Sequence, residues 1–122
     1  MTNFDIQVSS VPKPLLTALN QIYELEQRIA KHGDSCNLRR IIERLRDAFE
    51  EFGLVYEDPM GQRVNETRTD LEVSIAGTET QNLVVVEVIK PVIRAVDRGV
   101  PGFSKVVQRG IAVVKSTEEV NQ

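Results

Sequence analysis

The chain has 122 residues, of which 41% are hydrophobic and 27% are charged, a balance typical of a globular protein rather than a disordered one. The net charge of −3 and the lack of a separate basic block argue against a general nucleic-acid binder, whose affinity depends on neutralising phosphates. The single cysteine, Cys36, excludes an internal disulfide and a cysteine-based zinc site.

The first ten residues carry no helical period, and they lack the basic start and apolar core of a signal peptide. No apolar run approaches the roughly 20 residues that a helix needs to cross a bilayer. We therefore expect an irregular lead-in, no membrane association and a cytoplasmic protein.

A first amphipathic helix is predicted after Pro12 and Pro14, because a proline in the first turn of a helix needs no N–H donor. Its apolar residues recur every three or four positions, which is the period of one helix face. They are Leu15, Ala18, Ile22, Leu25 and Ile29, broadened by Leu16, Leu19 and Tyr23. Lys31 and His32 form a basic last turn before Gly33, which predicts the end of the helix there.

A second amphipathic helix follows, and Asp34 or Ser35 is suited to cap it, so we expect it to begin at about Cys36. Its apolar face is formed by Leu38, Ile41, Leu45, Ala48 and Phe52, widened by Ile42 and Phe49. The opposite face carries charged residues, among which Arg39 with Glu43 and Arg46 with Glu50 are predicted ion pairs four residues apart. We interpret this charged face as solvated.

A short link between the two helices predicts an antiparallel hairpin. Both apolar faces are broader than a single helix partner can cover. We therefore expect a homodimer in which two hairpins pack as a four-helix bundle. In the alternative, the strands that follow cover the remaining apolar face within a monomer.

The pattern changes after Gly53 to that of short strands. Asp58–Gly61 predicts a turn. Residues 71–75 alternate between apolar and polar, as in a half-buried strand, and residues 83–89 are nearly all β-branched, as in a central strand covered on both faces. Further strands are expected at residues 92–96, 106–107 and 111–114, with a frayed polar tail from Ser116.

These elements predict an α+β fold with two domains. Residues 1–53 would be a helical dimerisation hairpin, and residues 54–122 a compact β-domain of short strands, arranged as a sandwich or a small barrel.

Side chains that commonly carry chemistry are few. His32, in the last turn of a helix, is interpreted as a C-terminal cap, and Cys36 as a packed small residue. Glu66 and Asp70 are compatible with a pair of acid–base carboxylates, but we favour surface ion pairs that involve Arg68. We therefore predict neither an enzyme nor a metal or cofactor site.

Five short segments carry a resemblance to a known family through their order and spacing. They are residues 15–22 (LLTALNQI), 51–54 (EFGL), 58–59 (DP), 85–90 (VVEVIK) and 107–114 (VQRGIAVV). Taken in this order, they resemble the motifs LLPVLDNL, KxGV, FDP, VVEVLQKGY and VLRPAxVxV of the GrpE family, the nucleotide exchange factors of DnaK-type chaperones. The resemblance covers about residues 15–115.

The chain departs from the family at several of these motifs. Pro91–Val92 stands at the family's GY, Arg109–Ile111 at its RPA, and Asn65–Thr67 at its His-Glu-Ala. The family's long N-terminal helix has no counterpart before Leu15. The resemblance therefore implies a divergent and shortened GrpE-like protein.

The resemblance implies a function by binding, without a cofactor. The β-domain would bind the ATPase domain of a DnaK-type chaperone and promote ADP release, as a co-chaperone in protein folding and the stress response. Contact residues implied in the β-domain are Glu57, Ile89, Lys90, Lys105 and Arg109, and Gln27 and Arg28 would form a second, helical contact. The alternative is a dimeric interaction adaptor that keeps the fold without the exchange activity.

Overall fold

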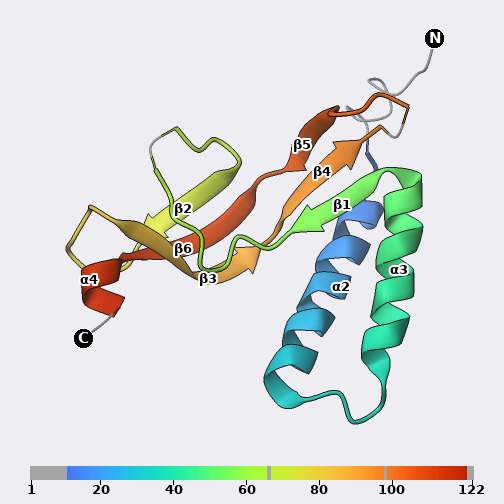
Figure 1. Ribbon diagram of the computed structural model, residues 1–122, viewed down its shortest axis with the longest axis horizontal. Helices are drawn as coiled ribbons and strands as arrows, with labels where there is room; N and C mark the ends of the chain where they lie inside the picture. Colours follow the sequence, from blue (N-terminus) through green and yellow to red (C-terminus); the bar gives the residue numbers. More distant parts are fainter. Residues whose placement is uncertain (1–10, 66, 98, 121–122) are drawn as a thin grey trace. The chain divides into compact units, whose positions relative to one another are not determined.

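The computed structural model describes residues 11–65, 67–97 and 99–120. In these residues two long helices precede six strands, which form two three-stranded sheets (Figure 1). The predicted α+β class is confirmed at this level. The predicted lead-in at residues 1–10 lies outside the described residues.

Helix α2, Lys13–His32, follows the predicted pattern closely. Pro14 lies in its first turn, and the N–H of Leu15 donates to the carbonyl of Pro12 at 3.0 Å. At the other end Gly33 has φ +90° and donates to the carbonyl of Ile29 at 2.8 Å, which ends the helix after a basic last turn. A residue with a side chain rarely adopts this φ, so glycine suits the position.

Helix α3, Leu38–Phe52, begins two residues after the predicted start at Cys36. The reason is Asn37, whose φ of +56° lies in the left-handed region and is incompatible with a helix. Asp34 nevertheless has the predicted capping role, because its carboxylate accepts from the N–H groups of Leu38 at 2.6 Å and Arg39 at 3.1 Å. Gly53, at φ +107°, ends the helix as predicted.

The chain divides into two compact units. The first unit holds α2, α3 and Ile93–Val107, and it therefore includes most of the sheet formed by β1 (Leu54–Glu57), β4 (Val92–Val96) and β5 (Ser104–Gln108), in the order β1–β4–β5. The second unit holds Glu57–Val92 and the chain from Gln108. Contacts thus group the chain differently from the predicted division after Gly53.

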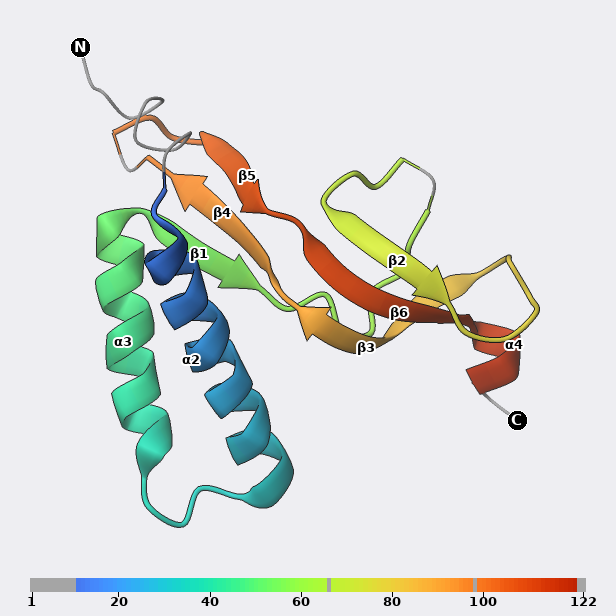
Figure 2. The same cartoon turned by 180° about the vertical axis from the view of Figure 1, so that it is seen from behind.

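The core of the first unit lies where the sheet packs on α2. It consists of the buried residues Leu19, Leu54, Ile93 and Ala95, with Phe49 of α3 and Tyr56 of β1 packed against them. The two helices lie antiparallel to each other (Figures 1 and 2). A second buried cluster, formed by Ile22, Ile29 and Ile42, joins them. Burial of such side chains, rather than helix propensity, supplies most of the stability of a hairpin of this size.

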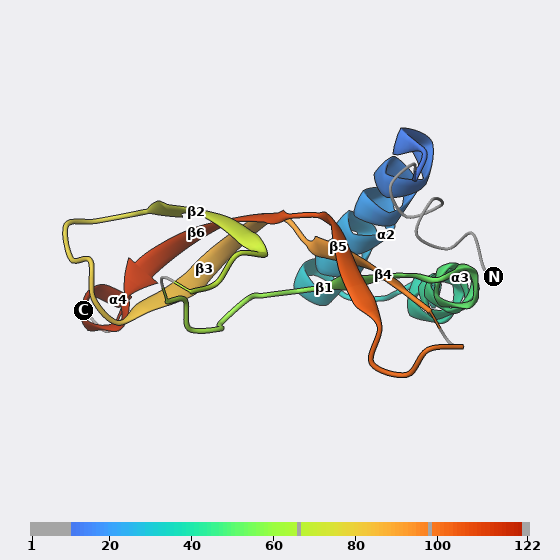
Figure 3. The same ribbon diagram turned by 90° about the horizontal axis from the view of Figure 1, so that it is seen from above.

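The second unit is built on a sheet with the order β2–β6–β3 (Figure 3). Strand β6, Gly110–Ser116, pairs in parallel with β2, Leu71–Ile75, and antiparallel with β3, Leu83–Lys90. The prediction that residues 83–89 form the central strand is wrong: β6 occupies the centre, and β3 is an edge strand with two register shifts.

Strand β2 also differs from its prediction. Leu71 is buried, but Val73 and Ile75 on the same face are 40% and 45% exposed, so the predicted half-burial holds only at the start of the strand. The strand lies at the edge of its sheet, and the described residues beyond it do not cover the end of this face.

The C-terminal segment is ordered where a frayed tail was expected. Ser116 is buried, and a short helix, α4 (Thr117–Val120), follows it. The N–H of Thr117 donates to the carbonyl of Asn82 at 2.9 Å, and the carboxylate of Glu119 accepts from the N–H of Glu79 at 2.8 Å. These bonds attach α4 to the segment between β2 and β3. The predicted barrel is also not formed, since the strands divide between two small sheets.

Candidate interaction surface on the helical hairpin

The junction of the two helices with β1 is fixed by polar and aromatic contacts. The hydroxyl of Tyr56 donates to Glu26 Oε1 at 2.9 Å, and Arg46 Nη1 lies 3.0 Å from Glu26 Oε2. The Arg46 guanidinium also lies 5.1 Å from the centre of the Tyr56 ring, which meets Tyr23 edge to face at 5.6 Å. Residues of α2, α3 and β1 are thereby held together. The predicted pairing of Arg46 with Glu50 is wrong, because Glu26 takes its place.

Only one side of α3 packs against the rest of the unit. Ile42 is buried, and Leu38 and Phe49 are partly buried against the same clusters. The neighbouring side is open: Ile41 is 53% exposed, Leu45 41% and Phe52 68%, and Ala48 is exposed as well. We call these four residues the open stripe. They are most of the apolar face that the sequence pattern predicts for this helix.

Among the described residues, the strands of this unit leave the open stripe uncovered. They pack on α2 through Leu54, Ile93 and Ala95, and they contact α3 at Phe49 and, through the Tyr56 ring, at Arg46. The strands thus cover the apolar face of α2 around Leu19, whereas Leu25 of α2 is 38% exposed and the open stripe of α3 is uncovered by the described strands of this unit. A shallow pocket lined by Leu15, Ala48, Phe49 and Phe52 adjoins the stripe.

An exposed row of large apolar side chains would gain free energy if another surface covered it. Each such side chain gains about 1.5–3 kcal/mol on full burial, so covering the half-exposed Ile41, Leu45 and Phe52 would contribute roughly 2–4 kcal/mol in total. Contiguous patches of this kind on small proteins mark contacts with other macromolecules.

The predicted contact residues of the first unit are exposed. Gln27 and Arg28 lie on the surface of α2, where Arg28 Nη2 is 2.8 Å from Glu24 Oε1. An ion pair this exposed contributes little to stability. Lys105 is exposed on β5. The structure therefore leaves all three side chains accessible to a partner.

Three of the predicted contact residues in the second unit lie at one end of its sheet. Lys90 pairs with Ile111 in the register of β3 and β6, so Ile89, Lys90 and Arg109 belong to the same end. Ile89 is 57% exposed, because it lies in a register shift of β3 that removes it from the regular alternation. Ile89 therefore lies outside the core. Glu57, at the end of β1, is exposed.

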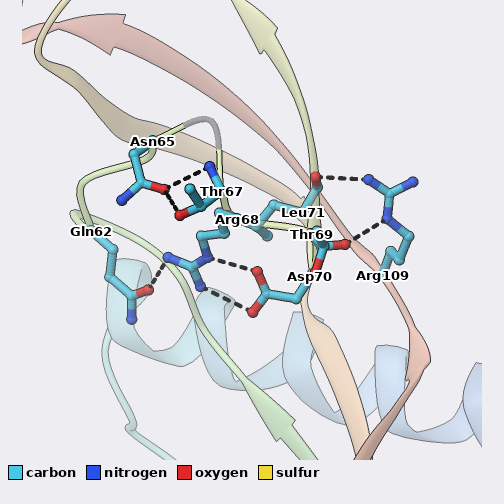
Figure 4. Close-up of polar contacts among 8 residues, drawn as sticks. All are labelled: Gln62, Asn65, Thr67, Arg68, Thr69, Asp70, Leu71 and Arg109. Carbon is cyan, nitrogen blue, oxygen red and sulfur yellow. Dashed lines mark hydrogen bonds and ion pairs between the residues drawn. The ribbon is translucent and has the colours of Figure 1, made fainter.

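Arg109 differs from the other predicted contact residues because its guanidinium is already occupied (Figure 4). Its Nε donates to the carbonyl of Thr69 at 3.1 Å, and its Nη2 to the carbonyl of Leu71 at 3.0 Å. Its Nη1 lies 3.5 Å from a carboxylate oxygen of Glu72. Arg109 therefore positions the beginning of β2.

A second polar cluster lies beside Arg109 in the same unit (Figure 4). Arg68 forms a two-pronged ion pair with Asp70, at 2.7 and 3.4 Å, and Arg68 Nη1 donates to Gln62 Oε1 at 2.7 Å. Asn65 Oδ1 accepts from the N–H and the hydroxyl of Thr67. The predicted ion pair of Arg68 with Asp70 is present, but it is partly buried rather than on the surface, since the two side chains are only 22% and 14% exposed. Glu66, the other carboxylate considered for acid–base chemistry, lies outside the described residues.

The other residues considered for chemistry are on the surface. His32 lies exposed in the last turn of α2. Cys36 is exposed, so its interpretation as a packed residue is wrong; the turn between the helices projects it outward. Among the described residues no three His, Cys, Asp or Glu side chains are grouped as metal ligands would be. None of the described helices has the length and apolar composition of a membrane span.

Comparison of the chain with family models, with curated proteins and with solved structures gives no match.

Two features of the surface were missed in the sequence. The role of Arg109 has no local signal, since its partners Thr69 and Leu71 are 40 and 38 residues away. The charges beside the open stripe do have a local signal in the sequence. Arg40 and Arg44 precede Asp47 and Glu51, and all four recur at the spacing of one helix face. We interpreted the whole charged face as solvated and therefore did not consider that these two basic residues come before these two acidic residues.

Proposed function

We propose that the protein is a GrpE-like nucleotide exchange factor, a cytoplasmic co-chaperone that acts as a homodimer on the ATPase domain of a DnaK-type chaperone. The observation that supports this most is the element order, a pair of helices followed by six short strands in small sheets. It agrees with the order that the five resembling segments imply. The open stripe of α3 supplies a surface for the dimer.

In this proposal the protein acts by binding alone and needs no cofactor. An exchange factor promotes ADP release if it binds the open nucleotide cleft more tightly than the closed one, because a ligand shifts an equilibrium only by its difference in affinity for the two states. A hundredfold difference corresponds to roughly 2.7 kcal/mol of coupling.

The accessible residues at the end of the second sheet would form the principal contact. Ile89 offers an exposed apolar side chain next to the positive charge of Lys90, a combination suited to a mixed apolar and acidic surface. Glu57 would add a contact from the second unit, and Lys105, Gln27 and Arg28 would make separate contacts from the first unit. Arg109 would act indirectly, since its bonds to β2 hold the sheet that carries Ile89.

The test is the rate of release of labelled ADP from the DnaK-type chaperone of the same genome. At saturating protein the rate should rise at least tenfold, and the double variant Ile89→Asp, Lys90→Glu should lose most of this effect. Lys31→Glu, a charge reversal at the exposed end of α2, is the matched control and should retain the activity. An unchanged rate with the native protein would refute the proposal.

The alternative is a dimeric adaptor that has the same fold and does not promote exchange. The occupied guanidinium of Arg109 favours it, because a residue that the family resemblance assigns to the partner contact is engaged within its own sheet. Binding of the chaperone, measured by titration calorimetry, together with unchanged ADP release would support the adaptor.

A further inference from the structure

The charges of α3 are segregated along the helix. Its first half, residues 39–46, has four arginines and one glutamate, whereas residues 47–51 have three carboxylates and no basic residue. This order opposes the helix dipole, which favours acidic residues at the N-terminus and basic residues at the C-terminus, by about 0.3–1 kcal/mol for each suitably placed charge. For an isolated α3 this charge order is therefore less favourable than the reverse order would be.

The residues beside the open stripe follow the same order, with basic residues in the first half of the helix and acidic residues in the second. Arg40, Arg44, Asp47 and Glu51 each directly precede one of the four stripe residues, so they form a parallel row on the adjacent flank of α3. Within this row Arg40 and Arg44 are four residues apart, as are Asp47 and Glu51. Like charges at this spacing destabilise a helix by roughly 0.2–0.5 kcal/mol per pair.

The described residues of the chain do not pair with these charges. All four side chains are exposed, and none of them has an ion-pair partner among the residues that the structure describes. Arg46 and Glu26, by contrast, do pair across the two helices on the packed side of the hairpin. A row of four charged residues without described ion-pair partners thus lies directly beside the open stripe.

We propose that the open stripe and its charge row bind α3 of a second copy of this chain in antiparallel orientation. Antiparallel packing places the basic half of each row opposite the acidic half of the other, with Arg40 near Glu51 and Arg44 near Asp47 of the second copy. It also places Ile41 opposite Phe52, and Leu45 opposite the small Ala48. Each large side chain at the centre then meets a small one, which allows close packing.

Parallel packing of the two helices about a two-fold axis along the seam would place the two charge rows on opposite sides of that seam, so neither row would face the other. Both Phe52 side chains would meet at one end, and both Ala48 side chains would leave a gap. Charge complementarity therefore selects the antiparallel second copy over the parallel one. The stripe from Ile41 to Phe52 extends about 16 Å along the helix, at about 1.5 Å per residue.

This inference rests on the dimer within the proposed function and specifies its interface and orientation. It is independent of nucleotide exchange: an adaptor without exchange activity would have the same dimer. A failure to promote ADP release would leave the result below unaffected, so the two outcomes are distinguishable.

Disulfide crosslinking tests the orientation in the full chain. In a Cys36→Ser background, Ile41→Cys and Phe52→Cys proteins are mixed under a glutathione redox buffer, and the crosslinked species are identified by intact mass. The mixed disulfide between Cys at 41 and Cys at 52 should exceed either homodisulfide at least tenfold. Predominant homodisulfides would show parallel packing and overturn the proposal. Glu43→Cys, on the charged face away from the stripe, is the control and should not crosslink.

Charge exchange tests the complementarity through the dimer dissociation constant, measured by analytical ultracentrifugation. Asp47→Arg with Glu51→Arg makes the row entirely basic and should weaken the dimer at least ~10-fold at low salt. Adding Arg40→Glu and Arg44→Glu gives a row with its acidic residues first and its basic residues second, so the two copies are complementary again. The dimer dissociation constant should then return to the native value. A native protein that stays monomeric at 100-fold higher concentrations than the crosslinking test, or an all-basic variant that dimerises like the native protein, would refute the interface.

Discussion

The hydroxyl of Tyr56 in β1 donates a 2.9 Å hydrogen bond to Glu26 in α2, although the two residues are 30 positions apart. Glu26 accepts at the same time from Arg46 of α3, at 3.0 Å. One carboxylate thus joins the two helices to the first strand of their unit. Because Tyr56 is only partly buried, we expect the hydrogen bond to contribute modestly to the free energy of unfolding. The contacts of the Tyr56 ring should contribute more.

Replacing Tyr56 by two different residues separates these contributions. Tyr56→Phe removes the hydrogen bond and keeps the ring against Tyr23 and Arg46, so the free energy of unfolding should fall by about 1 kcal/mol. Tyr56→Ala removes the ring as well and should cost roughly 3 kcal/mol. Urea denaturation followed by circular dichroism measures both. Equal losses in the two variants would show that the ring contacts contribute nothing.

Phe52→Ala should affect association much more than the stability of one chain. Phe52 is 68% exposed within the unit, so at low concentration the loss of unfolding free energy should stay below about 1 kcal/mol. If the open stripe is buried in a dimer, the dissociation constant should rise by at least tenfold. Ile42→Ala is the contrasting variant, because Ile42 is 1% exposed and should cost ~2–5 kcal/mol at every concentration.

Gly110→Ala should destabilise the second sheet. A methyl group at Gly110 would lie 2.6 Å from Leu71 Cδ2, 3.0 Å from Val92 Cγ2 and 3.2 Å from the carbonyl oxygen of Lys90. The central position of β6 gives these neighbours little room to move, so we expect a loss of about 1–3 kcal/mol. Gly99→Ala is the control: among the described residues a methyl group there would meet the side chain of Asp97 alone, and the free energy of unfolding should change by no more than about 0.5 kcal/mol. Chemical denaturation compares the two.

Arg109→Lys tests whether Arg109 positions β2 or contacts a partner. A lysine retains the charge but lacks the planar fork that reaches the carbonyls of both Thr69 and Leu71. We expect the free energy of unfolding to fall by about 1–2 kcal/mol and amide hydrogen exchange in β2 to become faster, without any partner present. Lys115→Arg, in the same sheet, is the control for a change between the two cationic residues. Unchanged exchange in β2 would assign Arg109 to partner binding instead.

The sequence alone determined the positions of most elements, because their signals are local. The prolines before Leu15, the glycines after His32 and Phe52, and the three- and four-residue apolar period define both helices within a few positions. Alternation and β-branched runs likewise located the strands near residues 71–75, 83–90 and 92–96. The error at the start of α3 also has a local cause, the left-handed conformation of Asn37, which a helix pattern does not reveal.

Only the tertiary structure decided how these elements are used. The apolar period of α3 does not show which part of its wide face meets α2; packing placed Ile42 inside and left Ile41, Leu45 and Phe52 open. The order of the strands in the sheet could not be predicted from the sequence either. Residues 83–89 are more hydrophobic than β6, but β6 is the central strand because it pairs with both β2 and β3. The bonds of Arg109 and Tyr56 depend on residues 30–40 positions distant. Local patterns encode which residues become helix or strand, whereas burial and partners depend on chain segments that meet only after folding.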